Sequence, residues 1–332
     1  MNGADTHSLL ALRDLSLTYP GRAGPVHVLD DVALDVAPGE FLGVVGESGS
    51  GKTQLLLSLL GLSAPGARLG GSIRFRGQEL VGAPEKALTG LRGARIGMIF
   101  QDPMTALNPY LTIGTQLTEG LRFHRGLDRA AAQRRALELL DAVHISEPER
   151  RLRQHPHELS GGMRQRVVIA MALSCEPDLL LADEPTTALD VTVQAQILAL
   201  LRELRERTRA AIILVTHDLG VIAEVADRVV VMYAGRIVEQ AGCEQLFSTA
   251  RHPYTEGLRR SIASLTGPLP QRMPSIGGNP PNPAALPPGC AFAPRCPYVE
   301  DRCRREKPPL ATVAAGHSRA CFHDGPLGGY GA

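Results

Sequence analysis

The sequence predicts an α/β protein with an inserted helical region. Apolar runs typical of buried parallel strands recur along the chain and alternate with amphipathic helical segments. One such run is followed directly by a glycine-rich loop and then by an apolar helical segment. At 332 residues the chain is long enough for about two domains, or for one large domain with an appendage.

The first third of the chain is predicted to be mainly strands, because apolar and polar residues alternate there. The expected elements are antiparallel strands over 8–19 and 26–35, a buried strand over 41–45, a helix over 52–61, and strands over 72–76 and 95–100.

From about residue 111 to 172 the apolar spacing becomes helical, and the segment 129–144 carries a clear apolar stripe. The elements expected in and after this region are a helix over 129–144, buried parallel strands over 178–182, 211–215 and 228–232, and an amphipathic helix over 191–208.

Composition and charge exclude several classes of protein. The formal net charge is +1 and aromatic residues make up 4% of the chain, with no Trp, so no nucleic-acid partner is expected. No segment approaches 18 consecutive apolar residues, and the N-terminus lacks a secretion signal. We therefore expect a cytosolic protein whose cysteines are largely reduced.

A glycine-rich loop lies between the strand at 41–45 and the helix at 52–61. Its sequence, Gly46-Glu47-Ser48-Gly49-Ser50-Gly51-Lys52-Thr53, fits the pattern G-x-x-x-x-G-K-[ST]. Glycines let backbone N–H groups wrap phosphates, and the start of the helix adds partial positive charge. We expect Lys52 to reach the β- and γ-phosphates of a nucleotide, and Thr53 to bind Mg²⁺.

Two adjacent carboxylates, Asp183 and Glu184, follow the strand predicted at 178–182. Adjacent carboxylates at a strand end can be solvated surface charge, but a phosphate loop in the same chain favours catalysis. Asp183 is predicted to hold Mg²⁺ directly or through water. Glu184 is predicted to activate the attacking water as the general base.

A second anion-binding pattern lies at 159–166 (LSGGMRQR), where Ser160, Gly161 and Gly162 precede an apolar helix. Ser160 suits a helix N-cap, and the glycines allow an anion to approach the helix start. A phosphate loop needs no second anion site in its own chain, whereas the nucleotide of another chain could use one. With this motif, the chain resembles an ATP-binding cassette (ABC) ATPase over about residues 8–245.

The resemblance implies a domain organisation. Residues 1–245 would form an ABC-type nucleotide-binding domain, with a RecA-like core, an antiparallel β-subdomain and an inserted helical subdomain at about 105–172. Residues 246–289 would form a connecting segment, which holds eight prolines over 268–288. A small Cys-containing C-terminal extension would occupy residues 290–332.

The resemblance also gives roles to four single residues. Tyr19 matches the aromatic residue that stacks on adenine, although a core residue on a strand face would have the same pattern. Gln101 matches the glutamine that senses the γ-phosphate, Mg²⁺ and the membrane partner, and His217 matches the switch histidine at the γ-phosphate. Asp190 matches a loop that contacts the opposite subunit, and it can also cap the helix at 191–208.

Such ATPases work in pairs, and each ATP lies between the Lys52 loop of one subunit and Ser160–Gly162 of the other. The implied partners are two membrane permease subunits, a second ATPase subunit (a paralogue favoured over another copy of this chain) and, indirectly, an extracytoplasmic solute-binding protein. The implied location is the cytoplasmic face of the inner membrane, as a peripheral subunit. Closure on ATP binding would reach the permeases through the Gln101 loop.

Longer segments resemble the ATPase subunits of dipeptide and oligopeptide importers in particular. These segments are 100–109, 155–173, 217–239 and 252–258. Importers of nickel, glutathione or other small solutes are the alternative, because they share this pattern. A soluble ABC ATPase acting in translation or DNA repair is less favoured, since this chain has one cassette and no long coiled coil.

Four of the six cysteines, Cys290, Cys296, Cys303 and Cys321, fall in the last 43 residues with the spacing C-x₅-C-x₆-C-x₁₇-C. This tail resembles the peptide-importer C-terminal domain, where such cysteines can hold an iron–sulfur cluster. Four thiolates suit a [4Fe–4S] cluster or a Cys₄ zinc site, and the lack of a C-x₂-C knuckle makes zinc less favoured. Four reduced thiols packed on the core are the remaining alternative.

Overall fold

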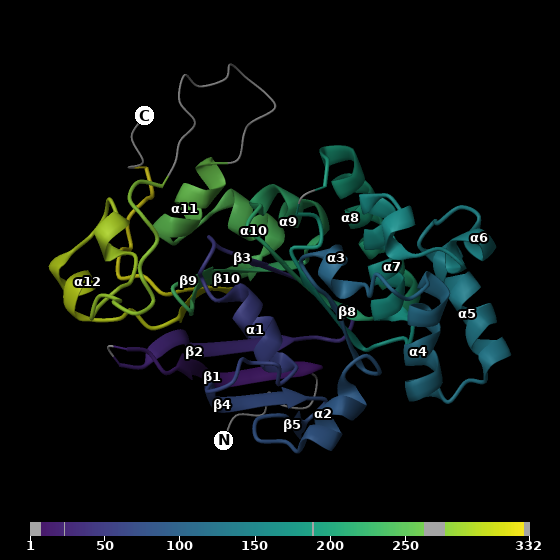
Figure 1. Ribbon diagram of the computed structural model, residues 1–332. Helices are drawn as coiled ribbons and strands as arrows, with labels where there is room; N and C mark the ends of the chain where they lie inside the picture. Colours follow the sequence, from purple (N-terminus) through teal and green to yellow (C-terminus); the bar gives the residue numbers. More distant parts are fainter. Residues whose placement is uncertain (1–7, 23, 188, 262–275, 329–332) are drawn as a thin grey trace. The chain divides into compact units, whose positions relative to one another are not determined.

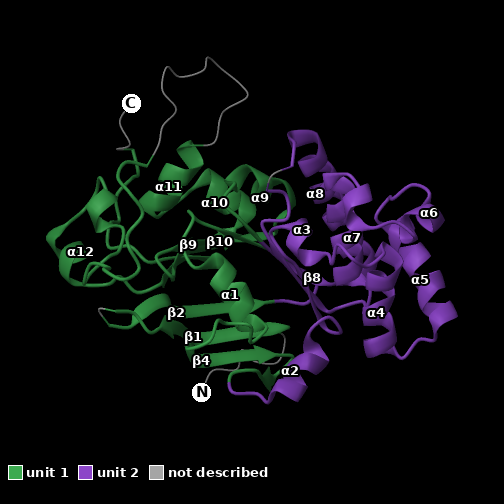
Figure 2. Cartoon of the chain, in the orientation of Figure 1, with its two compact units in different colours: residues 1–36, 41–81, 215–332 green, residues 37–40, 82–214 purple. Residues whose placement is uncertain are grey.

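The computed structural model describes residues 8–22, 24–187, 189–261 and 276–328 (Figure 1). The chain divides into two compact units (Figure 2). Unit 1 comprises residues 1–36, 41–81 and 215–332, and unit 2 comprises residues 37–40 and 82–214. Within the described ranges, none of the helices combines the length and hydropathy needed to cross a lipid bilayer.

Unit 1 contains a four-stranded antiparallel sheet in the order β2-β1-β4-β5. Its strands are β1 (Leu10–Tyr19), β2 (Val26–Val36), β4 (Arg68–Phe75) and β5 (Gln78–Glu79). Leucines 10, 12, 15 and 17 of β1 are fully buried, as the apolar pattern predicted. A bulge at Asp14 faces Gly71, whose φ is +85° and where a Cβ would lie 2.4 Å from the Asp14 carbonyl oxygen, so a side chain cannot fit there.

Unit 1 also holds the strands that lead to the glycine-rich loop. β3 (Phe41–Val45) pairs in parallel with β9 (Arg228–Tyr233), and β9 pairs antiparallel with β10 (Arg236–Gly242). The C-terminal segment extends this sheet through β12 (His317–Arg319) and β11 (Ala311–Ala314). The helices of unit 1 are α1 (Lys52–Leu59), α9 (Leu219–Val225), α10 (Cys243–Ser248), α11 (Pro253–Arg260) and α12 (Asp301–Arg305).

Unit 2 combines buried strands with most of the helices. β6 (Ile96–Ile99) pairs in parallel with β7 (Leu179–Asp183), and β8 (Ala211–Thr216), which begins in this unit, follows on the other side of β7. Its helices are α2 (Glu85–Leu91), α3 (Pro103–Ala106), α4 (Ile113–Arg125), α5 (Arg129–Ala142), α6 (Pro148–Leu152), α7 (Gly161–Leu173) and α8 (Val191–Thr208). The helices predicted over 129–144 and 191–208 are confirmed by α5 and α8.

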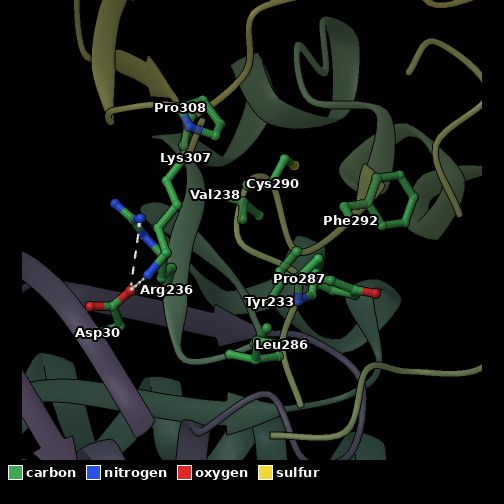
Figure 3. Close-up of a pocket in the computed structure, with 14 residues that line it drawn as sticks. Asp30, Tyr233, Arg236, Val238, Leu286, Pro287, Cys290, Phe292, Lys307 and Pro308 are labelled. Carbon is green, nitrogen blue, oxygen red and sulfur yellow. Dashed lines mark hydrogen bonds and ion pairs between the residues drawn. The ribbon is translucent and has the colours of Figure 1, made fainter. Parts of the chain in front are cut away.

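The C-terminal extension docks on the rest of unit 1. Phe292 is 1% exposed and lies against Tyr233 and Tyr254, with ring centroids 5.3 and 5.5 Å away. Lys307 donates a hydrogen bond of 2.7 Å to Asp30 of β2, beside a small pocket lined mainly by apolar groups (Figure 3). Residues 276–289 of the predicted proline-rich connection contain neither helix nor strand, and residues 268–275 lie outside the described ranges.

Candidate functional site

The residues predicted to surround a nucleotide are divided between the two units. Unit 1 carries Tyr19, the phosphate loop (residues 46–53) and His217. Unit 2 carries Gln101, Ser160–Gly162, Asp183, Glu184 and Asp190.

The phosphate loop begins where the fully buried strand β3 ends. A Cβ on Gly46 would lie 2.3 Å from the carbonyl oxygen of Met232, so this position accepts only glycine. Gly49 and Gly51 have φ values of +79° and +100°, which side chains rarely adopt, and Gly51 is the N-cap of α1. The glycine pattern therefore follows from backbone geometry that turns a buried strand into a helix within a few residues.

Lys52 turns back into its own loop. Its side chain is buried, and Nζ donates hydrogen bonds to the carbonyl oxygens of Gly46 at 2.7 Å and Glu47 at 3.0 Å. The ammonium group thus lies inside the loop whose N–H groups are expected to bind phosphate.

Tyr19 is not a core residue on a strand face. It is half-buried at the end of β1, and its hydroxyl donates to Gln54 Oε1 of α1 at 2.8 Å. The same hydroxyl accepts from the N–H of Ala64 at 3.3 Å. These bonds fix the ring next to the helix that follows the phosphate loop.

His217 is exposed and directly follows β8. The next residue, Asp218, caps α9 by accepting a hydrogen bond of 2.7 Å from the N–H of Gly220. The backbone after His217 is therefore anchored by the start of a helix.

In unit 2, Gln101 and Glu184 come together because they follow the neighbouring parallel strands β6 and β7. Gln101 Nε2 donates to Glu184 Oε2 at 3.3 Å, and Thr187 Oγ1 donates to the same oxygen at 2.8 Å. Glu184 has a φ of +44°, a strained conformation for a residue other than glycine, of the kind that gathers at functional sites. Asp183, the last residue of β7, is 3% exposed.

The predicted helix caps at Ser160 and Asp190 are confirmed. Ser160 Oγ accepts from the N–H of Met163 at 3.3 Å and begins α7, and Asp190 Oδ1 accepts from the N–H of Val193 at 2.9 Å and begins α8. A Cβ on Gly162 would lie 3.0 Å from a methyl group of Val193, whereas one on Gly161 would meet nothing within 4 Å. The start of α7 is thus open at Gly161.

The four tail cysteines lie near one another in unit 1 but do not form a ligand set. The N–H of Cys290 donates to the carbonyl oxygen of Cys303 at 2.7 Å. Burial raises the pKa of Cys296 to about 12 and that of Cys321 to about 11; backbone hydrogen bonds from Tyr298 and His323 oppose the rise, and the neighbouring cysteines add to it. Among the residues with described positions, no group of three or more His, Cys, Asp or Glu side chains is placed to hold a metal ion. The structure therefore gives no support to the predicted cluster.

Two residues beside the phosphate loop received no role from the sequence. The hydroxyl of Tyr254, on α11, accepts a hydrogen bond of 2.8 Å from the N–H of Glu47. Arg295, in the C-terminal extension, forms an ion pair with the Glu47 carboxylate at 2.6 Å. Local sequence does not indicate that either residue contacts the phosphate loop, because each lies more than 200 positions along the chain from Glu47.

Comparison with known proteins decides the family. A family model described as "ABC transporter" matches residues 29–187, and one described as "Oligopeptide/dipeptide transporter, C-terminal region" matches residues 238–303. The oligopeptide transport ATP-binding protein OppD of Salmonella typhimurium is 50% identical over 314 residues, which cover 95% of this chain and 93% of OppD. The chain belongs to the ATP-binding subunits of dipeptide/oligopeptide-type ABC transporters.

Other relatives of this ABC ATPase support the same family assignment. The oligopeptide transport ATP-binding protein AppD of Bacillus subtilis is 47% identical over 317 residues, covering 95% of this chain and 96% of AppD. Among solved structures, a dimeric ATP-binding cassette in a post-hydrolysis state, bound to ADP and Pi, is 31% identical with a TM-score of 0.64. The match covers 70% of this chain and 98% of that one. This ABC ATPase therefore has the ABC-type nucleotide-binding fold and is an ATP hydrolase, and ATP with Mg²⁺ is its substrate.

Proposed function

We propose that this ABC ATPase powers the import of di- and oligopeptides through separate membrane permease subunits. The observation that carries the proposal is the extent of the match to oligopeptide transport ATP-binding proteins, which covers 95% of the chain. The match includes the C-terminal region at 238–303 and not the cassette alone. Import of nickel, glutathione or another small solute is the alternative cargo assignment.

We further propose how the site residues act on ATP. The loop at 46–53 would wrap the phosphates, with Lys52 on the β- and γ-phosphates. Thr53, Gln101 and Asp183 would hold Mg²⁺, and Glu184 would take the proton of the attacking water. The hydrogen bonds that Glu184 accepts from Gln101 and Thr187 support its role as the base, because both go to one oxygen and fix the orientation of the carboxylate. His217 would contact the γ-phosphate, and Tyr19 would stack on the adenine.

The second half of each ATP site would come from another subunit. Ser160, Gly161, Gly162 and Asp190 would face the nucleotide held by the partner's phosphate loop. The open start of α7 at Gly161 supports this, since a helix N-terminus attracts anions. The partner would be a paralogous ATPase subunit or a second copy of this chain, and the pair would attach to two permease subunits at the cytoplasmic face of the inner membrane.

Peptide uptake in cells tests the cargo. Strains would carry, as their only copy, the wild-type chain, Glu184→Gln, or the control Glu224→Gln, which changes an exposed carboxylate on α9. Labelled di- and tripeptides should enter the wild-type and control cells but not the Glu184→Gln cells, with equal amounts of each protein in the membrane fraction. Undiminished uptake in the Glu184→Gln strain would contradict a peptide cargo, and nickel and glutathione would then be tested in the same strains.

For the tail, we propose that Cys290, Cys296, Cys303 and Cys321 take up a [4Fe–4S] cluster. The donor set supports this, because four cysteines gather in one unit and their thiols shift one another's pKa. Their present placement does not fit a cluster, so the thiols would have to move closer, and no catalytic step is assigned to it. The test is iron, sulfide and visible absorbance after anaerobic purification, with Cys303→Ser as the control. A chain that contains no iron, or only zinc, would contradict the proposal.

A further inference from the structure

The second residue of the phosphate loop, Glu47, is held by the C-terminal part of unit 1 through two separate groups. Its backbone N–H donates to the hydroxyl of Tyr254 at 2.8 Å. Its carboxylate accepts two hydrogen bonds from Arg295, at 2.6 Å from Nη1 to Oε2 and at 2.9 Å from Nη2 to Oε1. This bidentate pairing fixes the plane of the carboxylate as well as its distance.

The Arg295 side chain is buried and held by several hydrogen bonds. It is only 5% exposed, whereas surface arginines are usually solvated. Nε donates to the carbonyl oxygen of Gly277 at 2.8 Å, Nη1 also donates to the Tyr233 hydroxyl, and Nη2 to the carbonyl oxygen of Ile276, both at 3.3 Å. The guanidinium group therefore uses each of its nitrogens and cannot turn toward solvent without losing several bonds.

The same packing positions both groups that hold Glu47. Phe292, three residues before Arg295, packs against Tyr233 and Tyr254, whose own ring centroids are 4.6 Å apart, and all three rings are at most 2% exposed. Docking of the C-terminal extension on this cluster thus places the Arg295 guanidinium and covers the Tyr254 ring. The contact of Arg295 with Glu47 therefore depends on this docking, and the contact of Tyr254, which belongs to α11, lies beside it.

Glu47 in turn contacts the lysine of the loop. Its carbonyl oxygen accepts a hydrogen bond from Lys52 Nζ at 3.0 Å. The N–H, the carbonyl oxygen and the carboxylate of this one residue are therefore all engaged, two of them by the C-terminal part of the chain. Loss of Arg295 would leave a carboxylate of low exposure without its charge partner, and the loop would have to move to solvate it.

We propose that Arg295 is a positioning residue for nucleotide binding, acting through Glu47 to hold the phosphate loop in its binding conformation. It does not touch the nucleotide. Through it, the affinity for ATP depends on whether the C-terminal extension is docked. This rests on the role proposed above for the loop at 46–53 as the phosphate-binding segment.

Equilibrium binding of a fluorescent ATP analogue to the full-length chain tests the proposal without requiring turnover. Arg295→Met should raise the Kd about fivefold or more, and Arg295→Lys, which keeps the charge but not the bidentate geometry, should raise it less. Glu47→Gln should weaken binding, and the double variant Glu47→Gln/Arg295→Met should be no weaker than Arg295→Met alone, because the two residues act as one unit. The matched control is Arg305→Met, an exposed arginine of α12 in the same extension.

Two outcomes would overturn the proposal. One is a wild-type Kd in a folded Arg295→Met protein, and the other is additive effects in the double variant. If Arg295→Met fails to fold, the double variant, which leaves no unpaired buried charge, is measured in its place, and a wild-type Kd there also overturns the proposal.

Lys52→Ala distinguishes a failure of the proposed phosphate-binding role of the loop from a failure of the Arg295 inference alone. Unchanged ATP binding in Lys52→Ala would contradict the loop's assigned role, whereas loss of binding there with normal Arg295 variants would contradict this inference alone.

Discussion

Glu239 Oε1 on β10 lies 2.7 Å from His317 Nε2 on β12, and neither side chain is more than 1% exposed. The same carboxylate accepts hydrogen bonds from the backbone N–H groups of Arg251 at 2.6 Å and His252 at 3.0 Å. One buried carboxylate therefore joins the tail strand and the segment that leads into α11. Because α11 carries Tyr254, this junction also supports the contact to the phosphate loop.

Glu239→Ala should lower the free energy of unfolding of unit 1 by about 2–5 kcal/mol, because it leaves His317 Nε2 and the backbone N–H groups of Arg251 and His252 without their partner, and each buried group so left costs about 1–3 kcal/mol. Urea denaturation followed by circular dichroism measures this change. Glu244→Ala, which removes an exposed carboxylate on α10, is the control and should change stability by no more than about 0.5 kcal/mol. Equal effects of the two substitutions would contradict the role given to Glu239.

His252 should make the protein less stable in acid. Burial lowers its pKa from the usual 6.5 to about 4, against the opposing effect of Glu239. The unfolded chain binds the proton more readily, so the contribution of neutral His252 is complete above pH 6.5 and is lost as the pH falls toward 4. That contribution is roughly 3 kcal/mol.

His252→Asn isolates this effect. Asparagine can keep the hydrogen bond that His252 Nδ1 accepts from the N–H of Tyr254 at the start of α11, but it does not titrate. Urea denaturation of both proteins at pH 7, 6, 5 and 4 should show a shallower fall in stability for the variant. Parallel pH profiles would mean that His252 is not the titrating group.

Glu184→Gln should bind ATP but hydrolyse it at least about 100-fold more slowly, since a general base contributes on that scale. Phosphate release by the assembled transporter gives the rate, and a fluorescent ATP analogue gives the affinity. Glu206→Gln, which changes an exposed residue of α8, is the control and should hydrolyse ATP normally. Wild-type turnover in Glu184→Gln would rule out its assignment as the base.

Ser160→Arg should impair hydrolysis at the ATP site of the opposite subunit. The larger side chain would fill the open start of α7, where the partner's nucleotide is expected. A mixed dimer containing one Ser160→Arg subunit and one wild-type subunit, with phosphate release measured at each site, distinguishes the two sites. Ser146→Arg, at an exposed position before α6, is the matched control. Unchanged hydrolysis at the opposite site would count against shared sites.

Local patterns predicted most of the core elements. Helix α8 begins and ends at the residues expected, 191 and 208, because an N-cap aspartate and an apolar stripe are both encoded within the segment. The phosphate loop and the carboxylate pair were found in the same way. The strands β10, β11 and β12 were not predicted; β11 and β12 are only four and three residues long, and β12 pairs with β10, a distant segment of the chain.

The contacts that the sequence missed are those between distant segments. Gln101 and Glu184 were each predicted as site residues, but their hydrogen bond joins positions 83 residues apart. The ion pair of Arg295 with Glu47 spans 248 residues, and the sequence near either residue does not indicate the other as its partner. The tail, which is poor in large apolar residues, packs on Tyr233, Tyr254 and β10, and these contacts likewise join distant segments of the chain.

The pairing of β12 with β10 also protects the protein from strand-to-strand association with other chains. Without the tail, β10 would present unpaired N–H and C=O groups that another chain could use as a template for strand addition. The edge that the tail leaves instead, β11, is four residues long and follows two prolines, Pro308 and Pro309, which makes it a poor template. Chains cut short before residue 311, by a premature stop codon or by proteolysis, should therefore be prone to aggregate during expression even though the whole ATP-binding cassette is still encoded.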